Sequence, residues 1–344
     1  MRESAPAYAE LAVMSNFSFL EGGSHAGELI MRAHALGLAG IGIADRNTFA
    51  GIVRAHDAWC DKDLGNARAS GFRFLVGVRL CFRDGMPDIL AYPSDLAAYS
   101  RLCQLLSLGK KRAPKGDCYL DVADLARHAE GVLMIVMPPE HPDAAFVGRL
   151  ETMVALAPGR VWLAATMPRR GADRRRLVGL AALAEAAGLP LIATNDVLYH
   201  APDRRPLQDV LTCIREKTTV EKAGRLLEGN AERHLKHGAE MMRLFRDRPE
   251  AVAETMRFMA RIHFTLDEIK YHYPAESVPP GMTPQQHLEV LTWKGARERF
   301  PDGIPLEVET TLKKELAFIE KLEYPAYFLT VHDIVAYARE IGIL

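Results

Sequence analysis

The sequence has 344 residues, of which 49% are hydrophobic and 25% are charged, and its formal net charge is −1. That near-neutral charge excludes a global attraction to nucleic acid, so any such contact must come from local patches. No apolar run is long enough for a signal or membrane segment, and five scattered cysteines without a C-x-x-C pair exclude a disulfide frame or a zinc site. We therefore expect a soluble cytoplasmic protein of one large domain plus part of another.

The first two-thirds of the chain alternates short apolar strands with amphipathic helices. Helices are predicted at 26–37, 95–109 and 175–188. Fully apolar strands between such helices predict a parallel sheet covered on both sides. At least six units favour a closed α/β barrel, and the absence of G-x-G-x-x-G after the first strand argues against a dinucleotide fold. The strands are predicted at 9–14, 40–45, 72–82, 88–93, 132–137, 160–166 and 190–196.

The alternation stops near Thr218. The segment 223–262 is predicted to be mostly helical, with Pro249 starting a helix. Prolines break the pattern in 271–284, which predicts a domain boundary, and helices are expected again after it. The sequence stops within the apolar run "IGIL", from which we expect a longer parent protein.

Two carboxylates end predicted strands, Asp45 in "GIGIAD" and Asp196 in "LIATND". Such residues on a barrel are candidates for metal binding or acid–base chemistry, although each could equally cap the next helix or turn. The twelve histidines form no H-x-H, H-E-x-x-H or similar metal motif. Only His200 is expected near Asp196, whereas His25, His34 and His56 are expected on the surface or at helix caps.

Two loops concentrate positive charge. The loop 109–116, "GKKRAPKG", contains Lys110, Lys111, Arg112 and Lys115, and 168–176 reads "PRRGADRRR". They could contact phosphates or could simply be solvated loops. No aromatic residue lies among these charges, so base stacking is not expected there.

The order of several segments resembles one family. "LAVMSNFSFLEGGSH" followed by "GIGIADRNTFAG" is similar to the start of the PHP (polymerase and histidinol phosphatase) domain of bacterial DnaE-type polymerases. Later segments, including "ATNDVLYHAPDRRPLQDVLTCIREKTTV" and "EGNAERHLKHGAEM", resemble the error-prone, damage-inducible branch. "YPAYFLTVHDIVAYAREIGIL" resembles the opening of that family's polymerase palm.

The resemblance implies a distorted (β/α)7 barrel over 1–271, followed by the truncated start of the palm over 272–344. It also implies a multi-metal site, which in some members hydrolyses phosphodiesters. The family's ligands fall on Ala12, Met14, Asp45, Arg46, Arg79, Asp88, Asp196 and Leu198. Two carboxylates are kept and Asp88 is a third candidate, while two arginines, which cannot become ligands, have entered.

We therefore expect a metal-free, catalytically inactive PHP domain that supports the palm. Arg46 or Arg79 is expected to pair with Asp45 or Asp196 in place of metal. The resemblance implies an error-prone, translesion DNA polymerase as the parent, using Mg²⁺, DNA and deoxynucleotides, with a sliding clamp among its partners. The alternative is an active metal-dependent PHP phosphoesterase or 3′–5′ exonuclease, with His25, His141 or His200 as ligands.

Overall fold

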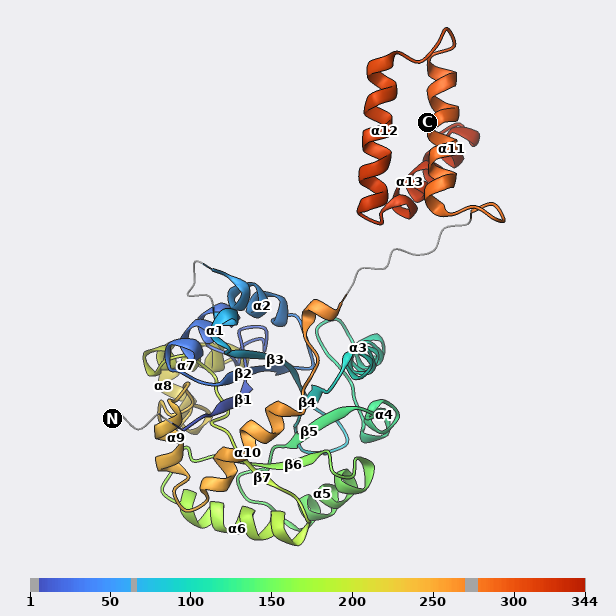
Figure 1. Cartoon of the computed structure of the whole chain (residues 1–344). Coiled ribbons are helices and arrows are strands. Elements are labelled where there is room, and N and C mark those ends of the chain that lie inside the picture. Colours follow the sequence, from blue (N-terminus) through green and yellow to red (C-terminus); the bar gives the residue numbers. More distant parts are fainter. Residues whose placement is uncertain (1–5, 63–66, 270–277, 344) are drawn as a thin grey trace. The chain divides into compact units, whose positions relative to one another are not determined.

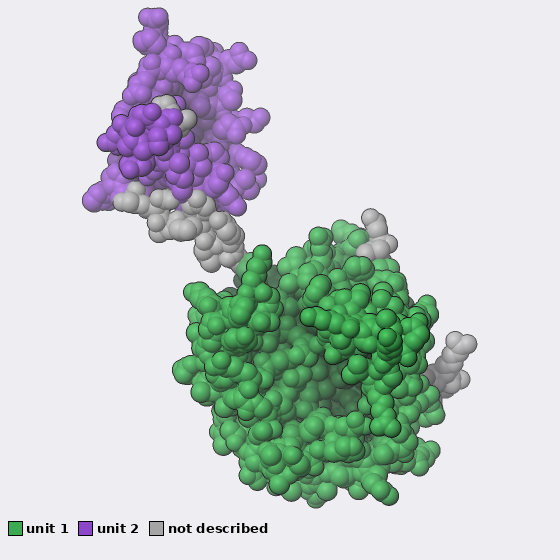
Figure 2. Space-filling view, turned by 180° about the vertical axis from the view of Figure 1, so that it is seen from behind, with its two compact units in different colours: residues 1–269 green, residues 270–344 purple. Residues whose placement is uncertain are grey.

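The computed structural model describes residues 6–62, 67–269 and 278–343. Contacts divide the chain into two compact units, residues 1–269 and 270–344, which Figure 2 colours separately. The domain boundary expected at Tyr271 lies outside the described residues.

The described part of the first unit contains one seven-stranded sheet in sequential order, which confirms the predicted strands. Neighbouring strands pair in parallel except around β4, which is antiparallel to both β3 and β5. The all-parallel sheet predicted from the apolar strands is therefore wrong at β4, because an apolar strand reads alike in either direction. The strands are β1 (Ala9–Val13), β2 (Gly40–Arg46), β3 (Arg73–Leu80), β4 (Ile89–Pro93), β5 (Val132–Val136), β6 (Val161–Ala165) and β7 (Leu191–Ala193).

The sheet closes into a barrel. Val13 at the end of β1 forms a parallel bridge with Val197, which follows β7. The Met14 amide donates to the Val197 carbonyl at 3.0 Å, and the Val197 amide donates to the Ala12 carbonyl at 2.7 Å. Helices surround the strands (Figure 1), so the α/β barrel expected from the sequence is confirmed.

The segment 223–262 contains less helix than predicted. Helix α10 begins at Pro249 as expected, but residues 227–237 are not helical because their polar groups bind strand-end loops. The helices of this unit are α1 (Ala26–Ala35), α2 (Ile52–Cys60), α3 (Leu96–Lys111), α4 (Val122–His128), α5 (Ala144–Leu156), α6 (Asp173–Ala186), α7 (Arg205–Arg215), α8 (Val220–Ala223), α9 (Gly238–Leu244) and α10 (Pro249–Ala260).

Helix α10 closes the end of the barrel where the parallel strands begin. Arg73, the first residue of β3, donates to the carbonyls of Met259 (2.8 Å) and Ile262 (2.6 Å). Phe258 joins the inward-facing strand residues in the core, and its ring meets Tyr92 of β4 edge-on at 5.4 Å between centroids. The opposite end, where the parallel strands finish, is therefore the open mouth at which a site can form.

Glycine at position 77 makes room for the interior ring of Tyr92. A Cβ at Gly77 would lie 2.5 Å from Tyr92 Cε1, and Tyr92 is fully buried. We expect Gly77→Ala to lower the free energy of unfolding by about 2 kcal/mol in urea denaturation, because overpacking a closed core forces neighbours to shift. The matched control is Gly148→Ala in α5, where a Cβ meets nothing within 4 Å. That substitution should stabilise the helix by about 0.5–1 kcal/mol, and equal effects of the two variants would contradict the packing argument.

The second unit contains three helices among its described residues, α11 (Pro284–Arg299), α12 (Leu306–Lys321) and α13 (Pro325–Glu340). Their small core is formed by Leu288, Leu316 and Leu329. Pro325 starts α13, and the helices expected after 271–284 are therefore found among the described residues. None of the described helices is long and apolar enough to cross a membrane.

Candidate functional site

Four polar residues singled out from the sequence meet at the mouth of the barrel. Asp45 and Arg79 lie at the ends of β2 and β3, and Asp196 follows β7. Asp88 comes just before β4. Because β4 runs antiparallel to β3, the start of β4 lies at the same end of the barrel as the end of β3. The topology therefore brings together residues that are up to 151 positions apart in the sequence.

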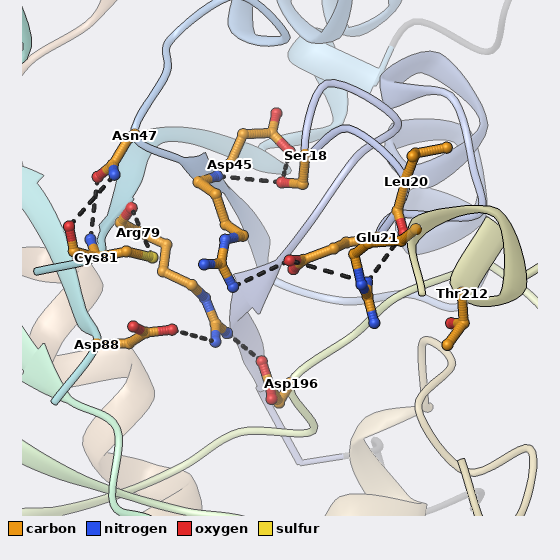
Figure 3. Close-up of polar contacts among 12 residues, drawn as sticks. Ser18, Leu20, Glu21, Asp45, Asn47, Arg79, Cys81, Asp88, Asp196 and Thr212 are labelled. Carbon is orange, nitrogen blue, oxygen red and sulfur yellow. Dashed lines mark hydrogen bonds and ion pairs between the residues drawn. The ribbon is translucent and has the colours of Figure 1, made fainter. Parts of the chain in front are cut away.

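Arg79 occupies the centre of this mouth. Its guanidinium pairs with the carboxylate of Asp196 and lies 3.4 Å from that of Asp88 (Figure 3). Only 6% of Arg79 is exposed, and its neighbouring carboxylates raise its pKa against the opposing effect of burial. The expected pairing of an incoming arginine with a retained carboxylate is confirmed for Arg79.

Asp196 is held by a second arginine. The Arg233 guanidinium lies 2.5 Å from the Asp196 carboxylate, and Arg233 Nε donates to the Asp196 carbonyl at 2.7 Å. Burial alone would raise the pKa of Asp196, but the Arg233 and Arg79 charges outweigh it and lower the pKa below its usual range. Asp196 is thus an ionised carboxylate whose charge is already balanced by two cations.

Asp45 makes no ion pair with Arg46 or Arg79. Its carboxylate accepts hydrogen bonds from the Ser15 amide, the Ser15 hydroxyl and the Ser18 hydroxyl, each at 2.7 Å. Burial raises its pKa, and the serine hydrogen bonds oppose that rise. Of the two carboxylates offered for the pairing, Asp196 therefore takes it and Asp45 does not, because the loop after β1 supplies Asp45 with hydroxyl and amide donors instead of a cation.

Arg46 turns outward. Its guanidinium lies 3.0 Å from the Glu21 carboxylate, and 43% of its side chain is exposed. Glu21 also approaches Arg215 at 3.9 Å. Of the two arginines offered for the pairing, Arg79 makes it, whereas Arg46 pairs with the loop carboxylate of Glu21.

Apolar side chains occupy the remaining three positions of the family's ligand set. Ala12 faces the barrel interior and is fully buried. Met14 and Leu198 pack against each other with Tyr199 in a separate small cluster. Thioether and hydrocarbon side chains cannot replace imidazole as ligands for a borderline or hard cation.

The side chains at the family's ligand positions do not fit a metal cluster. Both retained carboxylates are already engaged, Asp45 by hydrogen-bond donors and Asp196 by guanidiniums. The cations of Arg79 and Arg233 would repel an added metal ion. In the described part of the chain, no group of three or more His, Cys, Asp and Glu side chains is arranged to hold a metal.

The histidines weighed for this site lie in different places. His200 Nδ1 is 2.8 Å from the Ser24 hydroxyl and 3.9 Å from Glu28, so it serves the loop before α1. His25 is the N-cap residue of α1, as expected for a cap histidine. His141 lines a cavity of about 1000 Å³ that Asp196 and Arg233 also line.

Sequence reasoning missed two residues that organise this region. Arg233 left no signal, because nothing in "NAERHLK" marks a partner for Asp196. Glu10 did leave one: it is a lone acid within the apolar strand "AELAVM". It is buried and accepts hydrogen bonds from the Ala12 and Asn195 amides at 3.0 and 2.9 Å and from the Tyr8 hydroxyl at 2.7 Å, as well as from Thr194.

The two basic loops differ in how their charges are used. In 168–176, Arg170 pairs with Glu228 at 2.5 Å, and Arg176 donates to the Thr166 hydroxyl and to backbone carbonyls. In 109–116, Arg112 pairs with Asp124 at 2.8 Å. Lys110, Lys111 and Lys115 are exposed and form no ion pair with the described residues.

Comparison with known proteins shows what the chain is similar to. The chain is 58% identical over 98% of its length to an error-prone DNA polymerase of Rhodopseudomonas palustris, and it covers 30% of that protein. It is equally similar to an error-prone DNA polymerase of Brucella abortus, of which it covers 31%. The chain thus spans about a third of the length of the relatives that it matches. Residues 286–344 match the family of the bacterial DNA polymerase III alpha NTPase domain.

Among solved structures, an amidohydrolase from Chromobacterium violaceum matches 56% of this chain and 88% of its own, with 17% identity and a TM-score of 0.38. This similarity is too weak to bear on the site. The sequence relatives agree along the whole chain with the resemblance stated above, and the barrel has the seven strands expected of a PHP-like domain. Along nearly its whole length, the chain is thus similar to a segment that makes up about 30% of these error-prone DNA polymerases.

Proposed function

We propose that this chain forms the first part of an error-prone DNA polymerase, in which the PHP barrel is metal-free and does not hydrolyse phosphodiesters. The barrel over 1–271 then acts as a structural support for the polymerase segment that begins at 272. The parent enzyme would extend primers on damaged templates, using DNA, deoxynucleotides and Mg²⁺ held by residues outside this chain. A sliding clamp is proposed as its partner.

One observation carries the proposal for the barrel. Arg79, almost fully buried, sits between Asp196 and Asp88, where the family's site would hold cations. An arginine at this point neutralises Asp196 and Asp88 without supplying a Lewis acid or an activated water. Within residues 6–62, 67–269 and 278–343, the family's metal chemistry for phosphodiester hydrolysis therefore has no set of ligands.

The second unit supports the polymerase assignment. Residues 286–344, which match the polymerase III alpha family, cover most of α11 and all of α12 and α13. Helix α13 exposes Val331, Ile334 and Tyr337, each at least 43% exposed. An apolar surface of this kind is one that a further element of the polymerase would cover.

The test uses the polypeptide encoded by the complete gene. Primer extension on an undamaged template and on one with an abasic site, with Mg²⁺ and deoxynucleotides, should give product on both. The same preparation should not shorten a 3′-labelled single strand when Mn²⁺ or Zn²⁺ is supplied. Excision that is lost in Asp45→Ala and kept in Glu21→Ala would overturn the inactive barrel, and absence of extension would overturn the polymerase assignment.

A further inference from the structure

A groove of about 850 Å³ lies beside the barrel mouth, between the loop after β1 and the basic loop after α3. It is lined by aromatic rings from three separate segments, the 17–19 loop, the end of the β3 region and the segment after α3. The side chains that line it include Phe17, Phe19, Phe82, Tyr119, Lys110 and Lys115. The sequence showed no aromatic residue among the charges of 109–116, but the fold places four aromatic side chains against that loop.

The most exposed of these rings stands on an anchored loop. Phe19 is 82% exposed and Phe17 is 37% exposed, whereas Ser18 between them is buried. The Ser18 hydroxyl donates to the Asp45 carboxylate at 2.7 Å (Figure 3), so the residues on either side face outward. Asp45 is therefore a positioning residue, since it holds the loop that presents the two phenyl rings.

Glycine completes the anchoring of that loop. A Cβ at Gly22 would lie 2.0 Å from the Ser15 carbonyl oxygen. Only glycine therefore lets the end of the loop pack this closely against its beginning. The Gly22 amide donates to the Ser18 carbonyl at 3.1 Å, and the Asn16 amide donates to the Ser24 carbonyl at 2.8 Å. An exposed ring on a loop fixed in this way can bind a planar ligand without a large ordering cost.

The charges of the groove favour an anion. Its lining holds four cations, Arg46, Arg83, Lys110 and Lys115, against two acids, Glu21 and Asp117. Arg46 and Arg83 are already paired, with Glu21 and Asp121. The two lysines form no ion pair with the described residues, so their charge is available to a ligand.

Aromatic faces next to unpaired lysines are the combination that binds single-stranded nucleic acid, with bases on the rings and phosphates on the ammonium groups. A duplex would offer phosphates to the lysines but would keep its base faces stacked and unavailable to Phe19. We propose that this groove binds a segment of single-stranded DNA, with a base stacked on Phe19 and phosphates at Lys110 and Lys115. The inference rests on the proposed function in one respect, namely that a polymerase encounters a single-stranded template.

The test measures binding of a fluorescein-labelled 12-nucleotide oligothymidylate to the 344-residue chain by fluorescence anisotropy. Phe19→Ala should weaken binding about tenfold, in keeping with the stacking of one base. Phe19→Leu should weaken it similarly, because leucine keeps apolar surface but has no ring, whereas Phe19→Trp should retain it. Lys110→Ala with Lys115→Ala should lower the slope of log affinity against log salt by about 1.4.

Controls outside the groove are Val178→Ala, an exposed apolar residue of α6, and Lys222→Ala in α8, and both should bind as the unchanged chain does. Binding that is equally strong for a duplex of the same length, or that is unaffected by Phe19→Ala, would overturn the proposal. So would a Phe19→Leu variant that binds normally, because that result indicates an apolar or protein contact. These outcomes leave primer extension by the complete polypeptide untouched, so failure here is distinct from failure of the proposed function.

Discussion

Replacing Arg79 by leucine is expected to lower the free energy of unfolding by about 3 kcal/mol. The substitution leaves Asp88 without its arginine and leaves Asp196 with only Arg233. Removing one partner of a buried ion pair is strongly destabilising, because the other charge stays desolvated. The remaining Arg233 contact keeps the loss at the lower end of the usual range.

The matched control is Arg46→Leu, which removes the second arginine of the family's ligand positions. Its side chain is 43% exposed and pairs with Glu21, and exposed pairs contribute about 0–1 kcal/mol. Urea denaturation of both variants with the unchanged chain measures the difference. Equal losses of unfolding free energy in the two variants would contradict the claim that the buried Arg79 stabilises the barrel mouth more than the exposed Arg46 does.

The loss caused by Arg79→Leu should also depend on pH. The arginines lower the folded-state pKa of Asp196, so this carboxylate stabilises the fold above its unfolded pKa and ceases to do so as the pH falls through the lowered value. The difference in stability between Arg79→Leu and the unchanged chain should therefore be full at neutral pH and should shrink below about pH 4. A difference that grows on acidification would contradict the direction of the Asp196 shift.

Glu10→Gln is the second substitution with a large expected effect. Each carboxylate oxygen accepts two donors, one of which is a backbone amide, from Ala12 or from Asn195. Hydroxyls can rotate, but a backbone amide cannot, so the glutamine NH₂ must face at least one amide N–H. We expect a loss of about 3 kcal/mol, the cost of an unsatisfied buried donor within a shared network.

Tyr8→Phe is the control for this network. It removes one hydroxyl donor and leaves both amides bound to Glu10, so it should cost about 1 kcal/mol in the same denaturation experiment. A Glu10→Gln variant as stable as the unchanged chain would show that the carboxylate is not fixed by its four donors.

The barrel could be predicted from the sequence because its strands are short apolar runs between helices of clear period. The antiparallel direction of β4 could not, since "ILAYP" has the same pattern in either direction. The non-helical stretch 227–237 was also missed, because its polar side chains bind distant loops.

For the site, the residue types gave a hypothesis about metal binding, but they could not show which groups pair with each other. Arginine at 79 and apolar side chains at 12, 14 and 198 argue against metal from their residue types alone. The partners of each charge needed the fold: Asp45 is held by Ser15 and Ser18 from another strand end. Base stacking near 109–116 was not expected because the aromatic residues are contributed by other segments.

The metal content of the purified chain tests the central claim most directly. The 344-residue protein would be dialysed against equal concentrations of Mn²⁺ and Zn²⁺ and then gel-filtered, and the metal would be measured by mass spectrometry beside an Asp45→Ala, Asp196→Ala double variant. Because Arg79 and Arg233 already balance Asp196, we predict far less than one metal ion per chain and no difference between the two proteins. One or more equivalents in the unchanged chain, lost in the double variant, would contradict the account.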